Sequence, residues 1–401
     1  MRATFCNGNF YRAGRFQLAD LEVVAGRIHA FAPPATSRPP ADSSHRFIDL
    51  EGAFVLPGLI DAHAHLVLSP DAQRHEPLTA RVLKGARNAA IQLRAGVTSV
   101  RDVGGPGRIT VELREAIDAG TLEGPRVQTS ASFVCSTGGH VSYWGREADG
   151  PDEMQRAVRE QRKAGADFIK IMASGGVADE REDPSLAQLT QPELAAIVAT
   201  ARQSGTYVAA HAHPAHAIQM CLEAGVRTIE HASFMDQQCV ETALEKSAFI
   251  VPTFIVYDVM ARSENLSAGQ RDLAASVLER KADSFLRAVA AGVQWGVGTD
   301  AGSFMPQGQL WQEMRFIQRL GVSADRIIAA ATRTNAEIMR SPDVGSLETG
   351  AWADMLVLSD DPTKDLSVLE NPSLVVKGGQ VVHRSQSATT LPTLAPSGGR
   401  S

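Results

Sequence analysis

Short apolar runs alternate with amphipathic segments through most of this 401-residue chain. From Gly58 to about Arg340, a short apolar run is repeatedly followed by a segment of helical periodicity, which is typical of βα units around a parallel sheet. Eight such units predict an α/β protein with a (β/α)8 TIM barrel. The expected strands are Val55–Ala62, Val97–Val103, Arg126–Ala131, Asp167–Met172, Tyr207–His211, Thr228–His231, Phe249–Pro252 and Val293–Gly298, and the helical patterns include Asp152–Ala164, Gln191–Gln203 and Asp325–Met339.

The two ends of the chain differ from the middle. Residues 1–57 contain short apolar runs broken by a Pro/Ser/Ala-rich stretch at 33–44, which indicates a surface loop between strands. Residues 341–384 return to short strands and turns. We therefore expect both ends to build one small β-sandwich domain, with the barrel of residues 58–340 inserted between them. The Ser/Thr/Pro/Gly-rich residues 385–401 show no apolar periodicity and are expected to be a disordered tail.

Composition places the chain among folded, water-soluble proteins. Hydrophobic residues make up 44% and charged residues 21%, close to the average for globular domains. The net charge of −6 comes without a basic block, so we expect no nucleic-acid partner. No run approaches the roughly 18 apolar residues of a membrane span, and the first residues lack the apolar core of a signal peptide. The four cysteines are scattered without pairs, so a reducing, cytoplasmic compartment is expected.

Polar side chains close several of the expected strands. His63 and His65 lie in LPGLIDAHAHL, His211 closes TYVAAH, His231 closes RTIEH and Asp300 closes VQWGVGTD. Residues two apart in a strand share a face and lie about 7 Å apart, so two imidazoles can converge on one metal ion. The C-terminal ends of barrel strands all lie on one face, and we expect a metal site there. A general preference of strand ends for polar residues explains repeated imidazoles less well.

Lys170 interrupts the apolar run DFIKIM. Burying an unpaired ammonium group is costly, so this lysine needs a partner or a lowered pKa. A salt bridge to a barrel carboxylate is one interpretation. The sharper hypothesis is that the neutral amine has taken up carbon dioxide, giving a carbamate whose two oxygens bridge two metal ions.

In order and placement, PGLIDAHAH, Lys170, His211, His231 and GTDAG resemble the amidohydrolase superfamily. The segments VRDVGG, STGGH, KIMASGG and EHAS are further similar to its binuclear-zinc dipeptidase and carboxypeptidase branch, which is prolidase-like and imidazolonepropionase-like. This resemblance implies two divalent ions, most often Zn²⁺, and a homo-oligomer. The implied ligands are His63, His65 and Asp300 for one ion and His211 and His231 for the other, with carboxylated Lys170 and a hydroxide bridging them.

Other residues receive roles in that chemistry. Asp300 is the expected general base and acid, which takes a proton from the hydroxide and passes it to the leaving nitrogen. His140, in the loop after the third strand, is placed to donate a hydrogen bond to the developing oxyanion. Tyr257, Tyr143 and Arg101 are candidates for binding substrate. Core packing explains Tyr257 equally well, and the alternative for Arg101 is an ion pair with Asp102 or with a neighbouring strand.

His213 could compete with His211 for the ligand position, but His211 ends the apolar run. His75 lies in the segment after the first strand and could border the pocket.

The resulting hypothesis is a hydrolase that cleaves a carbon–nitrogen amide bond in a small substrate bearing a carboxylate. A dipeptide or an N-acyl amino acid fits, as does an amide-linked toxin such as ochratoxin. One alternative is a mononuclear cyclic-amide hydrolase or deaminase, against which Lys170 argues. Another is a non-catalytic barrel scaffold, although every expected ligand position is filled.

Overall fold

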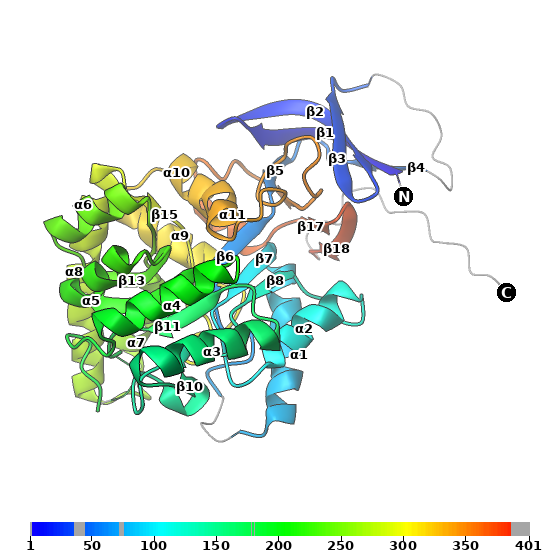
Figure 1. The fold of residues 1–401 in the computed structure, drawn as a ribbon. Helices are drawn as coiled ribbons and strands as arrows, with labels where there is room; N and C mark the ends of the chain where they lie inside the picture. The colour runs from blue at the N-terminus through cyan, green and yellow to red at the C-terminus, as the bar shows by residue number, and fades with distance from the viewer. Residues whose placement is uncertain (1, 36–44, 72–75, 178, 180, 386–401) are drawn as a thin grey trace.

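The computed structural model describes residues 2–35, 45–71, 76–177, 179 and 181–385. Its centre is a barrel of eight parallel strands with helices outside it (Figure 1). One sheet joins the first three strands and another joins the remaining five, to which the short strands β9 (Val134–Cys135) and β10 (Arg146–Glu147) are added. The eight strands are β6 (Leu59–Ala64), β7 (Val97–Asp102), β8 (Arg126–Thr129), β11 (Ile169–Met172), β12 (Val208–Pro214), β13 (Thr228–Phe234), β14 (Phe249–Val251) and β15 (Gln294–Trp295).

Backbone hydrogen bonds close the barrel at both seams between the two sheets. Asp167 N donates to Thr129 O at 2.7 Å at one seam. At the other, His65 N donates to Ala301 O at 2.9 Å and Asp300 N donates to His63 O at 2.7 Å. The closed parallel barrel confirms the fold predicted from the apolar pattern, and the second seam brings together three expected metal ligands, His63, His65 and Asp300.

The outer helices follow the predicted amphipathic segments. The expected helix at 191–203 has the same bounds in the structure, because the carboxylate of Glu193 accepts a hydrogen bond from Thr190 N at 2.8 Å in a capping box. The expected helix at 325–339 is divided by a π-helical turn at Ala330–Thr334. The helices are α1 (Leu78–Arg94), α2 (Ile109–Asp118), α3 (Gly150–Ala164), α4 (Gln191–Gln203), α5 (Ala215–Ala224), α6 (Gln237–Lys246), α7 (Phe254–Arg262), α8 (Ala268–Ala291), α9 (Leu310–Arg319), α10 (Ala324–Ala329) and α11 (Asn335–Ile338), with short 3₁₀ turns at Ser142–Trp144 and Leu366–Glu370.

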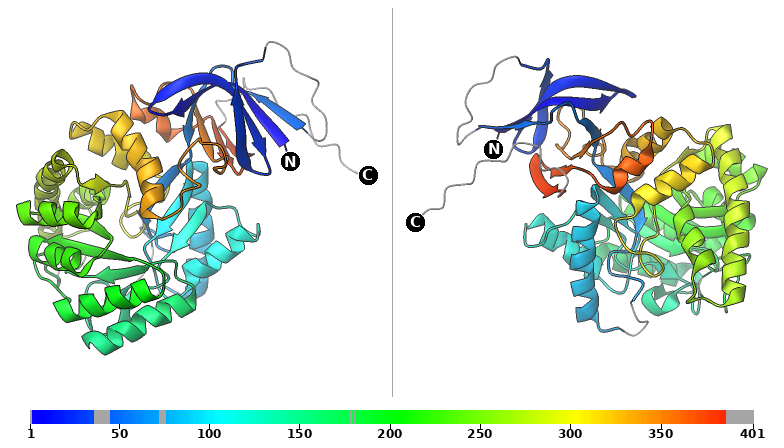
Figure 2. Two further views of the ribbon diagram at one scale, coloured as in Figure 1. Left: turned by 45° about the horizontal axis from the view of Figure 1, so that its top comes forward. Right: turned by 180° about the vertical axis from the view of Figure 1, so that it is seen from behind.

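A third sheet, to one side of the barrel, is built from both ends of the chain (Figures 1 and 2). Its hydrogen bonds join eight strands in one sheet rather than in the two separate layers of a simple sandwich. The reason is that β1 pairs with β4 along Arg2–Cys6 and then with β5 at Asn9–Phe10. The strands are β1 (Arg2–Arg12), β2 (Arg15–Val24), β3 (Arg27–Ala32), β4 (His45–Asp49), β5 (Phe54–Pro57), β16 (Met355–Leu358), β17 (Leu374–Lys377) and β18 (Gln380–Arg384).

The apolar run predicted as one strand at 55–62 is divided between the sheet of the chain ends, which contains β5, and the barrel, which contains β6. The break falls at Gly58, whose N donates to Asp354 O at 2.8 Å. A Cβ atom at this position would lie 2.0 Å from Thr98 Oγ1, so only glycine permits the close approach. Beyond the break, β6 continues to Ala64 and carries His63 within the strand.

Three expectations concern residues outside those described, namely most of the loop expected at 33–44, the tail from residue 386 onward, and His75. Within the described residues, none of the helices combines the length and the apolar character needed to cross a membrane.

Candidate metal centre

A cavity of about 310 Å³ opens where the barrel strands end. Its polar lining combines the imidazoles and the carboxylate that the sequence places at strand ends, and apolar side chains complete the wall. The polar lining residues are His63, His65, His140, Tyr143, Lys170, His211, His231, Tyr257, Asp300 and Ser303.

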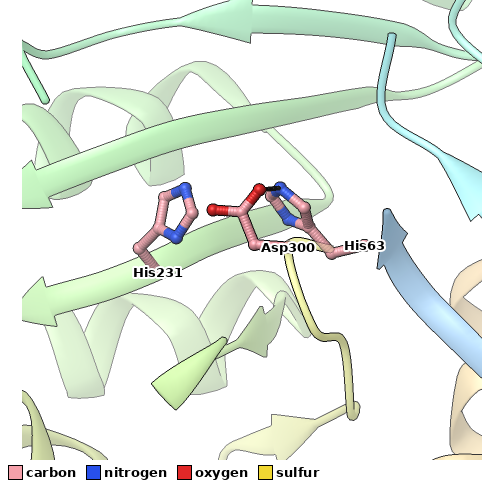
Figure 3. Close-up of side chains that lie close together, drawn as sticks. All are labelled: His63, His231 and Asp300. Carbon is pink, nitrogen blue, oxygen red and sulfur yellow. Dashed lines mark ion pairs between the residues drawn. The ribbon is translucent and has the colours of Figure 1, made fainter. Parts of the chain in front are cut away.

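Asp300 lies between His63 and His231 (Figure 3). Potential ligand atoms of these three residues all lie within 4.8 Å of one another. The Oδ1 atom of Asp300 is 3.4 Å from His63 Nε2 and 3.3 Å from His65 Nε2. Imidazole nitrogens and carboxylate oxygens at this spacing can share a divalent ion such as Zn²⁺.

Hydrogen bonds to the other ring nitrogens orient these imidazoles. His63 Nδ1 lies 2.8 Å from Glu230 Oε2, and His65 Nδ1 lies 2.6 Å from the carbonyl oxygen of Gly104. His231 Nδ1 lies 2.7 Å from Thr253 Oγ1. In metal sites such partners fix the tautomer and the direction of the ligating nitrogen, so the arrangement fits a metal centre.

The backbone is strained at two of the candidate ligands. His231 has φ +69° and Asp300 has φ +56°, in the left-handed region that residues other than glycine rarely adopt. Strain of this kind persists only where the surrounding structure enforces it, and it clusters at functional sites.

Of the two competing histidines in HAHPAH, His211 is the one that faces the cavity. Its ring centroid lies 4.6 Å from that of His231. His213 instead uses both ring nitrogens within the protein, since Nδ1 lies 2.8 Å from Ser233 Oγ and Nε2 lies 3.3 Å from Tyr257 OH. Burial lowers the pKa of His211 and of His231 well below the usual value, which keeps both rings neutral and able to bind a cation.

Lys170 is 1% exposed, and its Nζ atom has no hydrogen-bond partner among the described residues. Burial lowers the pKa of its amine from 10.5 to about 8, although Glu230 and Asp300 act against this shift. The salt-bridge interpretation is not supported, because the described part of the chain offers Lys170 no carboxylate within bonding distance. A buried amine with no partner in the described part of the chain, facing a cluster of candidate metal ligands, fits a site that holds metal through a modified lysine.

Asp300 carries a negative charge in the buried site. Burial favours its neutral form, but the imidazoles of His63 and His65 lower the pKa of the carboxyl well below its usual value. With its side chain 22% exposed, the carboxylate still reaches the cavity.

Comparison with known proteins identifies this combination of barrel and site. The sequence model of the amidohydrolase family matches residues 54–382. The chain belongs to the amidohydrolase family. The recognition from sequence motifs is thereby confirmed, and the protein is a hydrolase of this family.

Individual amidohydrolases show how far the similarity extends. An ochratoxinase from Aspergillus niger is 31% identical over an alignment of 409 positions, which covers 90% of this chain and 82% of that protein. An imidazolonepropionase from Salinispora arenicola is 27% identical over an alignment of 361 positions, which covers 84% of this chain and 84% of that protein. The crystal structure of a Xaa-Pro dipeptidase with methionine bound in its active site superposes with a TM-score of 0.88 at 30% identity, covering 96% of this chain and 100% of the other.

Of the three candidates for substrate binding, the two tyrosines line the cavity of this amidohydrolase. Tyr143 is 38% exposed at its mouth, whereas Tyr257 is 4% exposed and contacts His213. His140 also lines the cavity, with its ring stacked on His211 at a centroid distance of 4.3 Å.

The prediction that Arg101 binds substrate is wrong. Its side chain is fully buried inside the barrel, where Nη2 lies 2.7 Å from Glu230 Oε1 and Nε donates to Ala62 O at 2.6 Å. It is absent from the cavity lining. Arg101 does form an ion pair, but its partner is Glu230 on β13 and not Asp102 or a residue of the neighbouring strands β6 and β8.

Sequence reasoning assigned no role to Glu230 or to Glu182, each of which holds a histidine of the site. For Glu230 a signal existed, because a charged residue within an apolar strand needs a buried partner. Glu182 lies in a segment without hydrophobic periodicity, so the sequence carried no signal from which its contact with His140 could have been predicted.

Proposed function

We propose that this amidohydrolase cleaves the amide bond of a small substrate with a free carboxylate, such as a dipeptide or an N-acyl amino acid. The observation that carries the proposal is the amine of Lys170, which is buried, has no hydrogen-bond partner among the described residues and lies beside four histidines and Asp300. Mononuclear sites have no need of a lysine at this position, whereas a carbamate on it supplies two oxygen ligands.

Two divalent ions, most often Zn²⁺, would be held by residues already present. His63, His65 and Asp300 would bind one ion, His211 and His231 the other, and carboxylated Lys170 both. When bound, such ions lower the pKa of water and polarise a carbonyl group.

The side chains of the cavity supply the remaining chemistry. Asp300 accepts the proton of the attacking water and delivers it to the leaving nitrogen, which must be protonated to depart. His140 donates a hydrogen bond to the substrate oxygen on which negative charge develops. Tyr257 and Tyr143 contact the substrate from the wall of the cavity.

The size of the cavity and the relatives support a small amide as substrate. A volume of about 310 Å³ lies at the lower end of the range for ligand pockets. An ochratoxinase and a Xaa-Pro dipeptidase are among the similar proteins. We extend from them only the shared chemistry, hydrolysis of an amide next to a carboxylate.

The test is a panel of dipeptides and N-acyl amino acids varied at the C-terminal residue, each assayed beside its C-terminal amide. We expect hydrolysis of the free acids and little of the amides. Metal analysis should give two ions per chain, and native mass spectrometry should show one carbon dioxide added to the wild type and none to Lys170→Met. Equal cleavage of acids and amides would refute the carboxylate requirement.

A mononuclear cyclic-amide hydrolase is the second candidate, favoured by the similarity to an imidazolonepropionase. It predicts one ion per chain and an unmodified Lys170. A non-catalytic scaffold, the third possibility, predicts only background hydrolysis of the panel, equal in the wild type and in Asp300→Asn, whereas our proposal predicts turnover by the wild type and its loss in the variant.

A further inference from the structure

Glu182 holds the ring of His140 at the wall of the cavity. Its Oε2 atom lies 2.5 Å from His140 Nδ1, and each side chain is 11% exposed. The same oxygen accepts a hydrogen bond from Gly176 N at 2.8 Å, while Oε1 accepts a longer one from Val141 N at 3.4 Å. Three N–H groups therefore fix the carboxylate in the segment between β11 and α4.

The ring of His140 is also confined on its faces and edge. One face stacks on His211 with an interplanar angle of 26°. The Cε1 atom of the ring packs against Gly176, where an added Cβ atom would lie only 2.1 Å from it. The contacts with Gly176 and His211 set the plane of the ring. A half-turn about the Cβ–Cγ bond would still return the ring to the same plane with its nitrogens in different places.

The contact with Glu182 removes that remaining freedom. An ionised carboxylate only accepts hydrogen bonds, so the facing Nδ1 atom carries a hydrogen. The opposite nitrogen, Nε2, has no hydrogen-bond partner in the described part of the chain, and His140 lines the cavity. A flipped ring would turn Nδ1 away from Glu182 and leave the buried carboxylate with one partner fewer.

We infer that Glu182 is a positioning residue for amide hydrolysis, which acts through His140 by fixing the ring with Nε2 presented to the substrate carbonyl. The inference rests on the proposed function for its effect on turnover. Its structural part, the hold on His140, is independent of which amide is cleaved.

The chain offers a matched control in Glu147. This carboxylate accepts a hydrogen bond from Gly138 N at 2.7 Å, two residues before His140, and so supports the same loop without contacting the ring. A merely structural role of Glu182 would resemble that of Glu147.

The first measurement is nitrogen and proton NMR of the histidine side chains in metal-loaded protein. We expect a far-downfield Nδ1 proton of His140 in the wild type and in Glu147→Ala, and its loss in Glu182→Ala. A wild type in which this resonance is absent, as judged against His140→Ala, would overturn the inference whether or not the enzyme hydrolyses amides.

The second measurement is a double-mutant cycle on the best substrate of the panel, with metal content verified for each variant. Glu182→Ala should lower kcat about 100-fold with little change in KM, since a small misplacement of a positioned group costs about that much. Glu182→Gln, whose amide oxygen can still accept from Nδ1, should restore much of the loss. In the His140→Ala background, Glu182→Ala should have little further effect.

Additive losses, or an equal effect of Glu147→Ala, would overturn the assignment of Glu182 while leaving the proposed function intact. Absence of wild-type hydrolysis across the panel would instead refute the proposed function, and the NMR result would still decide whether Glu182 holds His140.

Discussion

Glu230 joins a candidate metal ligand to a buried guanidinium, with Oε2 at 2.8 Å from His63 Nδ1 and Oε1 at 2.7 Å from Arg101 Nη2. All three side chains are at most 1% exposed. Burial favours the neutral form of Glu230, but Arg101 and His63 lower the pKa of its carboxyl well below the usual value. An ionised carboxylate therefore holds His63 with Nε2 directed toward Asp300.

Replacing Glu230 by glutamine should weaken metal binding by about 10–100-fold, because partners of this kind fix the ligating ring and raise its basicity. Competition of wild type and E230Q with a chromogenic zinc chelator measures the difference. The control is Glu193→Gln, since that carboxylate caps α4 and lies outside the cavity lining. Equal zinc affinities of wild type and E230Q would contradict the prediction.

Arg101 should matter for folding and not for substrate choice. Arg101→Met leaves Glu230 without its buried counter-ion, which should lower the free energy of unfolding by about 3–5 kcal/mol. Urea unfolding of the metal-free protein measures this loss, and the double variant Arg101→Met/Glu230→Gln should lose less than the sum of the two single changes.

The ratio of kcat/KM for free-acid and amidated substrates should be the same in Arg101→Met and in the wild type. A collapse of this ratio in the variant would show that Arg101 recognises the carboxylate after all.

Lys170 should make the stability of the metal-free protein depend on pH. Because burial lowers the pKa of its amine from 10.5 to about 8, the unfolded chain binds more protons than the folded chain between these values. The contribution of Lys170 to stability is thus present above the unfolded pKa and is lost as the pH falls through the folded one.

Urea unfolding at about pH 7 and about pH 10 should give a larger gain in stability for the wild type than for Lys170→Met. The comparison is needed because other buried groups titrate in both proteins. A gain of the same size in the two proteins would mean that Lys170 is not held as a depressed amine.

The positions of the candidate ligands could be predicted because strand ends are visible in the apolar pattern. His63, His211, His231 and Asp300 each close or follow an apolar run, and barrel topology sends such ends to one face. The bounds of α4 could be predicted because its capping signal is local.

What the sequence did not reveal depends on contacts between distant segments. The apolar run across Gly58 looks continuous, because sequence alone does not show that each half joins a different sheet. Arg101 lies near the end of β7, as the candidate ligands lie near the ends of their apolar runs, but its side chain is buried inside the barrel against Glu230. Glu182 reaches His140 from a segment whose composition carries no structural pattern.

Lys281 and Glu313 are two buried titratable residues near Tyr257, and the charge of each favours the charged form of the other. Lys281 Nζ lies 4.2 Å from the ring centroid of Tyr257 and has no hydrogen-bond partner among the described residues. Glu313 accepts hydrogen bonds from Phe254 N at 2.8 Å and Ile255 N at 2.6 Å, at the start of α7. Burial lowers the pKa of the Lys281 amine and raises that of the Glu313 carboxyl, so each residue depends on the other for its charge.

Removing only one of the two groups should therefore destabilise the protein strongly, because the other stays buried without its electrostatic partner. Lys281→Met and Glu313→Gln should each lower the free energy of unfolding by about 3–5 kcal/mol, and the double variant should lose clearly less than their sum. Urea unfolding of the metal-free proteins at neutral pH measures the cycle. The exposed pair Arg94 and Glu123, 2.7 Å apart, is the control and should couple by less than about 1 kcal/mol. Additive losses at Lys281 and Glu313 would show that the two groups are neutral and independent in the folded protein.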